Sequence, residues 1–301
     1  MTKIFKTRAG KGGRRVLDGI DLDVGEGMLG LLGANGAGKT TLMRLLTTVL
    51  TPTSGRIVVD GHDLATGPGV RAVKQLLGYL PQELSLYPDL TGWEFLDYVA
   101  LLKGIGDKVT RRRQVGDLLE RVSLSEVAKE RIATYSGGMK RRIGIAQALL
   151  GDPRLLIVDE PTAGLDPHER MRFRSLLASL GGRRVVILST HILDDVAQSC
   201  PQVAVLSAGR VAYHGATVGL TSAATGHTYL IPPGHDVPED ATVVNAVTTP
   251  AGTEYRVVSP RAVTGGKPVE PTLEDGYAAL LHRSGTEPVA KGNHGGSVVI
   301  S

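Results

Sequence analysis

The stretch Met28-Leu29-Gly30-Leu31-Leu32-Gly33-Ala34-Asn35-Gly36-Ala37-Gly38-Lys39-Thr40 is the most informative part of this 301-residue chain. Its first five residues form a short apolar run that suits a buried strand. Glycines dominate the next part, and after Thr40 apolar residues recur at helical spacing up to Val49. The sequence therefore predicts a strand, a glycine-rich loop and a helix in direct succession.

The loop Gly33–Thr40 matches the pattern G-x-x-x-x-G-K-[ST] of phosphate-binding loops. In such loops, glycines let backbone N–H groups surround the phosphates, the lysine reaches the β and γ oxygens, and the hydroxyl binds Mg²⁺. Lys39 and Thr40 are the candidates for these roles. A glycine-rich turn with a surface lysine is the alternative, but the flanking strand and helix favour the phosphate-binding loop.

Two adjacent acids follow a second apolar run, Leu155–Val158. Ligands of open α/β sheets bind at the carboxyl ends of strands, which is where Asp159 and Glu160 would lie. Asp159 suits the metal, and Glu160 suits the attacking water. Taken alone, the pair could be a solvated turn, whereas behind a phosphate-binding loop we favour the functional interpretation.

A third motif, Tyr135-Ser136-Gly137-Gly138-Met139, is predicted to begin a helix that continues to about Leu150. Its serine lies 97 residues after Lys39. A serine followed by two glycines at a helix N-terminus leaves free N–H groups facing outward. We expect an anion site there, for which this chain offers no obvious occupant.

The rest of the chain alternates predicted strands and helices, with a strand at Val185–Ser189 and a helix beginning near Pro167. The sequence of residues 89–150 predicts helices, and the capping-box pair Thr91 and Glu94 marks the start of the first one. We predict an α/β fold of the P-loop NTPase (RecA-like) type, with a mostly parallel sheet, an inserted helical subdomain at about 89–150 and a small C-terminal α+β domain. The predicted boundaries are 1–216 and 217–301.

Composition narrows the class of protein. Aromatic residues make up 4% of the chain, too few for the stacking platforms of single-strand nucleic-acid binders. The single cysteine, Cys200, excludes an intrachain disulfide. The net charge is +4, and because residues 217–301 hold 5 Lys/Arg against 8 Asp/Glu, the positive surplus belongs to the first 216 residues. With no signal peptide and no apolar run of about 18 residues, we expect a soluble protein made in the cytoplasm whose membrane role would need a partner.

Taken together, these motifs resemble the ATP-binding subunits of ABC transporters, in particular bacterial exporter subunits related to the daunorubicin/doxorubicin resistance ATPases. The resemblance covers about residues 14–216, with six motifs in order. They are Walker A Gly33–Thr41, the Q-loop glutamine Gln82, the signature Tyr135–Met139, Walker B Leu155–Glu160, the D-loop Ala163-Gly164-Leu165-Asp166 and the switch histidine His191.

The resemblance implies ATP and Mg²⁺ as ligands and ATP hydrolysis as the activity. It implies Glu160, His191 and Lys39 as catalytic residues and Thr40, Gln82 and Asp159 as metal ligands. The implied nucleotide-binding residues are Gly33, Asn35, Gly36, Ala37, Gly38, Lys39, Thr40, Thr41, Gln82, Ser136, Gly137, Gly138 and Asp166. Gln82 and His191 could each be merely a surface or structural residue, and Asp166 also suits a helix N-cap before Pro167.

In this family two ATPase domains close head to tail, so that each ATP lies between one copy's Walker A and the other's signature. The resemblance therefore implies a homodimer, an integral membrane permease subunit as partner and a peripheral location on the cytoplasmic face of the membrane. No nucleic-acid partner is expected. Gln82 and the helical subdomain are the expected contact with the permease, which would determine the cargo.

The chain departs from the family pattern at two places. Tyr135 and Met139 flank the Ser-Gly-Gly core where Leu and Gln are usual, a form that resembles this exporter branch. The family usually stacks an aromatic residue on adenine, but 8–16 contain none, and Phe5 is the nearest candidate. Near the C-terminus, 271–277 resembles a Leu-Glu-Asp segment that is associated with an accessory domain.

Two other classes of function are open at this stage. An ABC ATPase acting on DNA or ribosomes is one, but the 97 residues between Lys39 and Ser136 cannot contain the long coiled coils of chromosome ATPases. Translation factors of the superfamily carry two ATPase domains in one chain. A P-loop kinase is the other, and it would leave both the Ser136 motif and His191 unexplained.

Overall fold

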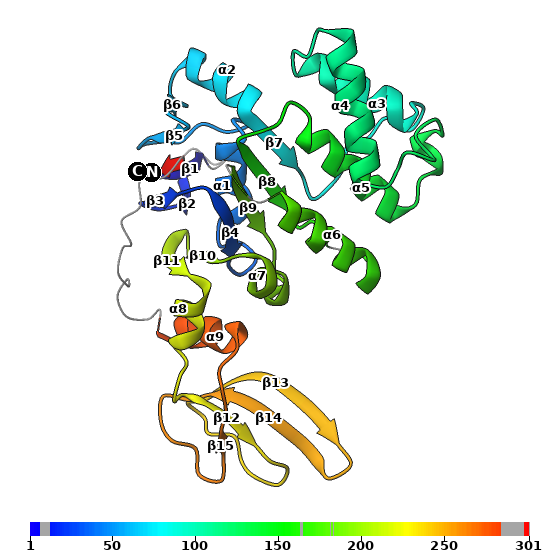
Figure 1. Ribbon diagram of the computed structural model, residues 1–301. Helices are drawn as coiled ribbons and strands as arrows, with labels where there is room; N and C mark the ends of the chain where they lie inside the picture. The colour runs from blue at the N-terminus through cyan, green and yellow to red at the C-terminus, as the bar shows by residue number, and fades with distance from the viewer. Residues whose placement is uncertain (7–12, 163–164, 181, 183, 284–297, 301) are drawn as a thin grey trace.

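A parallel sheet forms the centre of the molecule (Figure 1). The computed structural model describes residues 1–6, 13–162, 165–180, 182, 184–283 and 298–300, and within them this sheet has six strands in the order β11-β10-β4-β9-β8-β7. All neighbours in it pair in parallel except β10 and β11. The strands are β4 Gly27–Leu32, β7 Leu77–Leu80, β8 Leu155–Asp159, β9 Val185–Ser189, β10 Gln202–Ser207 and β11 Arg210–Ala216. This arrangement confirms the predicted α/β fold.

Both faces of the central sheet are buried, as is usual when helices connect parallel strands. Leu29 and Leu31 of β4 pack in one apolar cluster with Leu42 of α1 (Lys39–Leu46). Leu32, one position further along the strand, packs in the opposite cluster with Val196 of α7 (Leu193–Ser199). The alternation along β4 therefore anchors the glycine-rich loop, which follows it directly, between two rigid layers.

The loop between β4 and α1 requires glycine at specific positions. Gly36 and Gly38 have φ angles of 82° and 110°, in the region that residues with a Cβ rarely adopt. Gly38 is also the N-cap of α1, and no side chain caps that helix end. The first N–H groups of α1 therefore face the space above the loop.

A second sheet packs beside the first in the order β3-β16-β5-β6. Its strands are β3 Leu22–Val24, β5 Ile57–Val59, β6 His62–Asp63 and β16 Val298–Ile300. We expected every residue after 216 to belong to a C-terminal domain, and for β16 this is wrong. Val298 and Ile300 are fully buried between β3 and β5, because their apolar side chains join the core that also contains Leu42.

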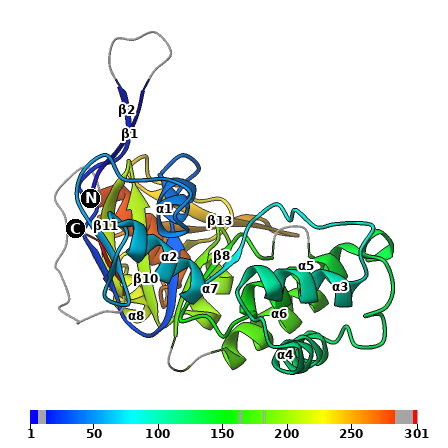
Figure 2. The ribbon, with the colours of Figure 1, turned by 90° about the horizontal axis from the view of Figure 1, so that it is seen from above.

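The helices expected in 89–150 are α3 Gly92–Leu102, α4 Lys108–Arg121 and α5 Gly137–Leu149, with a short 3-10 turn at Ile132–Thr134. The capping box forms as predicted: the Thr91 side chain accepts from the Glu94 N–H, and the Glu94 carboxylate accepts from the Thr91 N–H. Figure 2 shows these helices grouped at one end of the molecule, beyond β8. Two further helices lie outside this region: α2 Gly67–Leu76 precedes it in the chain, and α6 Pro167–Ser179 follows it.

After β11 the chain forms a separate antiparallel sheet in the order β13-β14-β12-β15 (Figure 1). The elements are α8 Thr217–Ser222, β12 Thr228–Ile231, β13 Thr242–Thr249, β14 Gly252–Val258, β15 Lys267–Pro268 and α9 Leu273–Arg283. Asp275 of α9 is fully buried and accepts hydrogen bonds from the guanidinium of Arg256 on β14, which fixes the helix to the sheet. We propose that 217–283 form the accessory domain, to which β16 does not belong.

The N-terminus forms a hairpin of β1 Lys3–Lys6 and β2 Gly13–Leu17, which extends away from the body in Figure 2. Phe5 and Arg14 lie directly opposite each other in this antiparallel pair. Opposite residues of an antiparallel pair share one face, so the two side chains project on the same side of the hairpin.

Candidate nucleotide site

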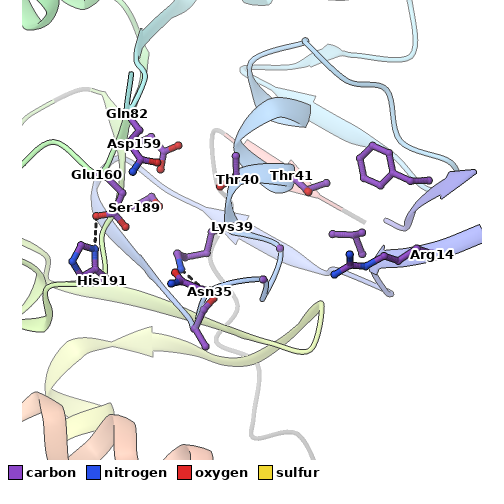
Figure 3. A pocket seen from close by; sticks show the side chains of 15 residues that line it. Arg14, Asn35, Lys39, Thr40, Thr41, Gln82, Asp159, Glu160, Ser189 and His191 are labelled. Atoms are coloured by element: carbon purple, nitrogen blue, oxygen red, sulfur yellow. Dashed lines mark hydrogen bonds and ion pairs between the residues drawn. The ribbon is translucent and has the colours of Figure 1, made fainter. Parts of the chain in front are cut away.

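A cavity of about 670 Å³ opens at the carboxyl ends of β4, β7, β8 and β9 (Figure 3). Ligands of open parallel sheets bind at this edge. Ten of the predicted site residues line the cavity: Asn35, Gly36, Gly38, Lys39, Thr40, Thr41, Gln82, Asp159, Glu160 and His191. Gly33 and Ala37 belong to the same loop but are buried beneath the cavity wall.

Lys39 opens α1 and is 9% exposed. Its ammonium group donates hydrogen bonds to the carbonyl oxygens of Gly33 and Ala34, which hold it over the loop. Burial lowers the pKa of Lys39, while the carboxylates of Glu160 and Asp159 oppose that shift. A cation held beside the free N–H groups of a helix N-terminus is a suitable site for a polyphosphate.

Asp159 is the last residue of β8 and is 4% exposed. Burial raises the pKa of its carboxyl group, and the positive charges of Lys39 and Arg141 partly offset this effect. The Thr40 hydroxyl and the Gln82 amide line the same cavity. These three groups offer hard oxygen atoms, the ligand type that Mg²⁺ prefers, and they leave room for phosphate and water ligands.

Glu160 follows Asp159 and contacts the switch histidine. Its Oε2 lies 2.7 Å from Nδ1 of His191, which follows the neighbouring strand β9 (Figure 3). The Glu160 side chain is 12% exposed and that of His191 62%. The Glu160 N–H donates to the Ser189 carbonyl at 2.8 Å, and its φ is 45°, in the left-handed region. This backbone turn directs the carboxylate toward the cavity rather than along the strand.

The signature residues lie elsewhere. Ser136 is the N-cap of α5, and its hydroxyl accepts a hydrogen bond from the Met139 N–H at 3.2 Å. Asp166 caps α6 by accepting from the Glu169 N–H at 2.8 Å, as the sequence predicts. Among the described residues, the cavity wall includes none of Ser136, Gly137, Gly138 and Asp166. The D-loop residues Ala163 and Gly164 lie outside the described part of the chain.

Four cavity residues are not among the predicted site residues: Arg14, Val16, Ala34 and Ser189. Ala34 lies inside the predicted loop. Ser189 ends β9 opposite Asp159, so the rule that ligands bind at strand ends would have found it. Arg14 and Val16 are on the hairpin, where no local motif points to the cavity. Phe5, predicted as the candidate for adenine stacking, lines the cavity beside them.

Known proteins match about two thirds of this chain. The model of the family described as "ABC transporter" matches residues 17–163. A daunorubicin resistance ATP-binding protein from Streptomyces coeruleorubidus is 41% identical over 206 residues, which are 68% of this chain and 64% of that protein. A linearmycin resistance ATP-binding protein from Bacillus subtilis (strain 168) is 36% identical over 221 residues, 73% of this chain and 70% of that protein.

Solved structures agree with these matches. An ATP-binding subunit of an ABC transporter is 30% identical, with a TM-score of 0.62 over 73% of this chain and 90% of its own. A dimeric ATP-binding cassette, solved in a post-hydrolysis state with ADP and Pi, has a TM-score of 0.64 at 24% identity and covers 71% of this chain and 95% of its own, which supports the fold alone. The matched part of this chain spans about three fifths of the length of several curated relatives.

Proposed function

The chain belongs to the family of ABC transporter ATP-binding proteins, and we propose that it hydrolyses ATP to drive export through a separate membrane subunit. One observation carries this proposal: a single cavity gathers the loop lysine, an acid for the metal, an acid for water and a histidine, while the signature helix begins outside it. This division suits an enzyme whose catalytic site is completed by another subunit.

Within the cavity, the N–H groups of the loop and of the start of α1 would bind the phosphates, and the Lys39 ammonium would exchange its loop carbonyls for phosphate oxygens. When Mg²⁺ is bound by Thr40, Gln82 and Asp159, it neutralises charge on the phosphates. Glu160 would accept a proton from the attacking water, with its carboxylate oriented by His191. His191, the more exposed of the two, would also contact the γ-phosphate.

The signature motif would act on the nucleotide of a second copy. The N–H groups at the start of α5 are suited to binding an anion, and the cavity of the same chain does not include them. A head-to-tail homodimer would place Ser136, Gly137 and Gly138 of one subunit against the phosphates held by Lys39 of the other. Asp166, at the start of α6, would lie at the same contact.

The membrane partner would dock on the helical region close to Gln82. Tyr87 and Tyr98 form an edge-to-face pair with ring centroids 5.8 Å apart, although they are 51% and 41% exposed. Leu101 and Leu102 continue this apolar surface along α3. Among the described residues, no helix has the length and apolar character needed to cross a bilayer. We propose that a permease segment covers this surface, which would place the chain on the cytoplasmic face of the membrane.

A nucleic-acid or ribosome-directed ATPase is less well supported. The relatives described above are named for drug resistance. The exposed surface formed by Tyr87, Tyr98, Leu101 and Leu102 is apolar and aromatic, whereas nucleic-acid interfaces are strongly positively charged.

Mixing two inactive variants tests the proposal. Lys39→Ala damages the cavity, and Ser136→Arg damages the signature, so a heterodimer of the two has one site with both defects and one with neither. We expect partial recovery of ATPase activity that rises with protein concentration. Absence of recovery, together with wild-type specific activity that stays constant down to dilutions where only monomer exists, would exclude the two-subunit ATPase.

The transport part needs a second experiment. Wild-type protein and a Leu102→Glu variant would be incubated with membranes from the source cells, solubilised and recovered by affinity tag. We expect an integral membrane protein to copurify with the wild type and to be lost from the variant, whose ATPase cavity is unchanged. Equal recovery with both proteins would exclude the α3 surface as the docking site.

A further inference from the structure

Arg141 of α5 is a buried cation whose bonding capacity is fully used. It is 7% exposed, although it sits on a helix that begins at the protein surface. A guanidinium has five N–H donors. All five donate to backbone carbonyl oxygens, those of Pro81, Gln82, Asp159, Glu160 and Pro161.

These carbonyls belong to two functional segments. Nη1 donates to Pro81 at 3.1 Å and to Gln82 at 2.9 Å, both directly after β7. Nη2 donates to Asp159 at 3.1 Å and to Glu160, and Nε donates to Pro161 at 2.8 Å. One planar group therefore joins the Gln82 segment to the turn that carries both acids.

The turn at Glu160 needs such support. A residue with a Cβ in the left-handed region costs about 1–3 kcal/mol and persists only where its surroundings hold it. The φ of Glu160 is 45°, and the three successive carbonyls around it, those of Asp159, Glu160 and Pro161, all point at Arg141. Hydrogen bonds from a charged donor are stronger than neutral ones, so this fork stabilises the turn.

We propose that Arg141 is a positioning residue for ATP hydrolysis in its own chain. It holds the backbone of Gln82 and of 159–161 so that the Glu160 carboxylate and the Gln82 amide stay aimed into the cavity. This inference rests on the proposed ATPase function. It assigns to a residue of the signature helix a role in the cavity of its own chain, whereas Ser136, at the start of that helix, is proposed to act on the nucleotide of a second copy.

Arg142, the next residue, offers a matched control. It is also an arginine of α5 with a mostly buried side chain, 19% exposed. Its Nη1 donates to two backbone carbonyls, those of Val122 at 3.1 Å and Ser123 at 2.9 Å. Those carbonyls follow α4 and belong to neither cavity segment. Arg142 also forms an ion pair with Glu169 of α6 at 3.7 Å. Replacing Arg142 therefore removes two backbone hydrogen bonds and one ion pair without touching the Glu160 turn.

Arg141→Lys keeps the charge but replaces the planar fork with a group of three donors at one point. We expect ATP affinity to stay within about twofold of wild type, because the loop that binds the phosphates is not contacted by Arg141, while kcat falls about tenfold to a hundredfold. Arg142→Lys should leave kcat within about twofold even where its melting temperature falls equally. A wild-type kcat for Arg141→Lys, or an equal kcat loss in both variants, would overturn the assignment.

Mixing experiments then show which site Arg141 serves. If it serves its own cavity, Arg141→Lys subunits are rescued by Ser136→Arg subunits, which contribute an intact cavity, and not by Lys39→Ala subunits. The reverse pattern, or rescue by neither, would overturn the proposal. Recovery in the Lys39→Ala and Ser136→Arg mixture is the positive control, and its failure counts against the dimeric ATPase rather than against Arg141. Arg141→Gln is the second variant; if both variants fail to fold, Arg141 is a structural residue and the assignment is wrong.

Discussion

Glu160 and His191 are joined by a 2.7 Å contact between Oε2 and Nδ1, although one residue follows β8 and the other follows β9. Because the two strands are direct neighbours, their carboxyl ends hold the pair in place before any ligand arrives. A carboxylate held this way is ready to accept a proton from water.

Glu160→Gln should therefore bind ATP and turn it over at least about a hundredfold more slowly, a loss typical of removing a general base. Gln has nearly the same shape, so the fold should not change. The ATP-bound dimer should accumulate, which size-exclusion chromatography with MgATP would detect. Wild-type hydrolysis by the variant, with only monomer on the column, would show that Glu160 is not the base.

Lys39→Ala should abolish hydrolysis while the protein stays folded. Lys39 is the ammonium group at the wall of the cavity beside Asn35 and Thr40, and its loss leaves the β and γ oxygens without their positive partner. Steady-state ATPase assays give the activity, and a melting curve serves as the folding control. Normal turnover in a pure, folded variant would contradict the phosphate-binding role.

Phe5→Ala should weaken ATP binding. An aromatic ring stacked on a base contributes about 1–3 kcal/mol, and since Phe5 is 38% exposed we expect the lower part of this range, roughly a fivefold to tenfold rise in KM. Phe5→Tyr is the matched control and should stay close to wild type. Binding of inorganic tripolyphosphate, which has no base, should be equal in all three proteins; an equal loss of ATP and tripolyphosphate binding would refute stacking.

Lys103 should make stability depend on pH in the alkaline range. Burial lowers its pKa from 10.5 to about 8, while its ammonium donates to the Leu77 carbonyl at 2.7 Å. Between these two values the unfolded chain binds the proton that the native protein has lost, so the free energy of unfolding should rise with pH, by up to about 3 kcal/mol.

Urea unfolding of the wild type and of Lys103→Met at several pH values from 7.5 to 10.5 measures this effect. The difference between the two proteins isolates Lys103 from the tyrosines, several of which have pKa values raised by burial. Parallel curves for the two proteins would mean that Lys103 keeps an ordinary pKa.

Cys200 should be unreactive in the native protein. It is 3% exposed, and burial raises the pKa of its thiol to about 12, so very little thiolate is present at neutral pH. Because the chain has one cysteine, a colorimetric thiol reagent reports on this position alone. Labelling should be slow in buffer and fast in urea, and equal rates in both would contradict the burial of Cys200.

Much of the fold and of the cavity could be predicted because many of their parts carry a local signal. The helix starts at Thr91 and Asp166 depend on a side chain and an N–H three residues away, and both caps form as predicted. The acids at 159–160 follow a buried strand, and the strand end determines where they lie.

The contributions of Arg141 and of Arg14 could not be predicted in the same way, although Phe5, on the same hairpin as Arg14, was predicted as the candidate for adenine stacking. Arg141 bonds to backbone carbonyls, which every residue has, so no partner residue type reveals the contact. Phe5 and Arg14 both line the cavity because the N-terminal hairpin places them opposite each other. No local sequence motif links this hairpin to the glycine-rich loop. Both cases depend on tertiary packing between segments that are distant in sequence.

The position of β16 has a consequence for how the chain folds. Val298–Ile300 is an interior strand of its sheet, with β3 on one side and β5 on the other, more than 230 residues earlier in the sequence. Contacts this far apart form late, because a long loop must close first. On the ribosome, β3 and β5 would emerge long before the strand that separates them, and during that interval their inner edges would be open to pairing with other chains. Chaperone demand during synthesis should therefore be greatest between the emergence of β5 and the emergence of β16.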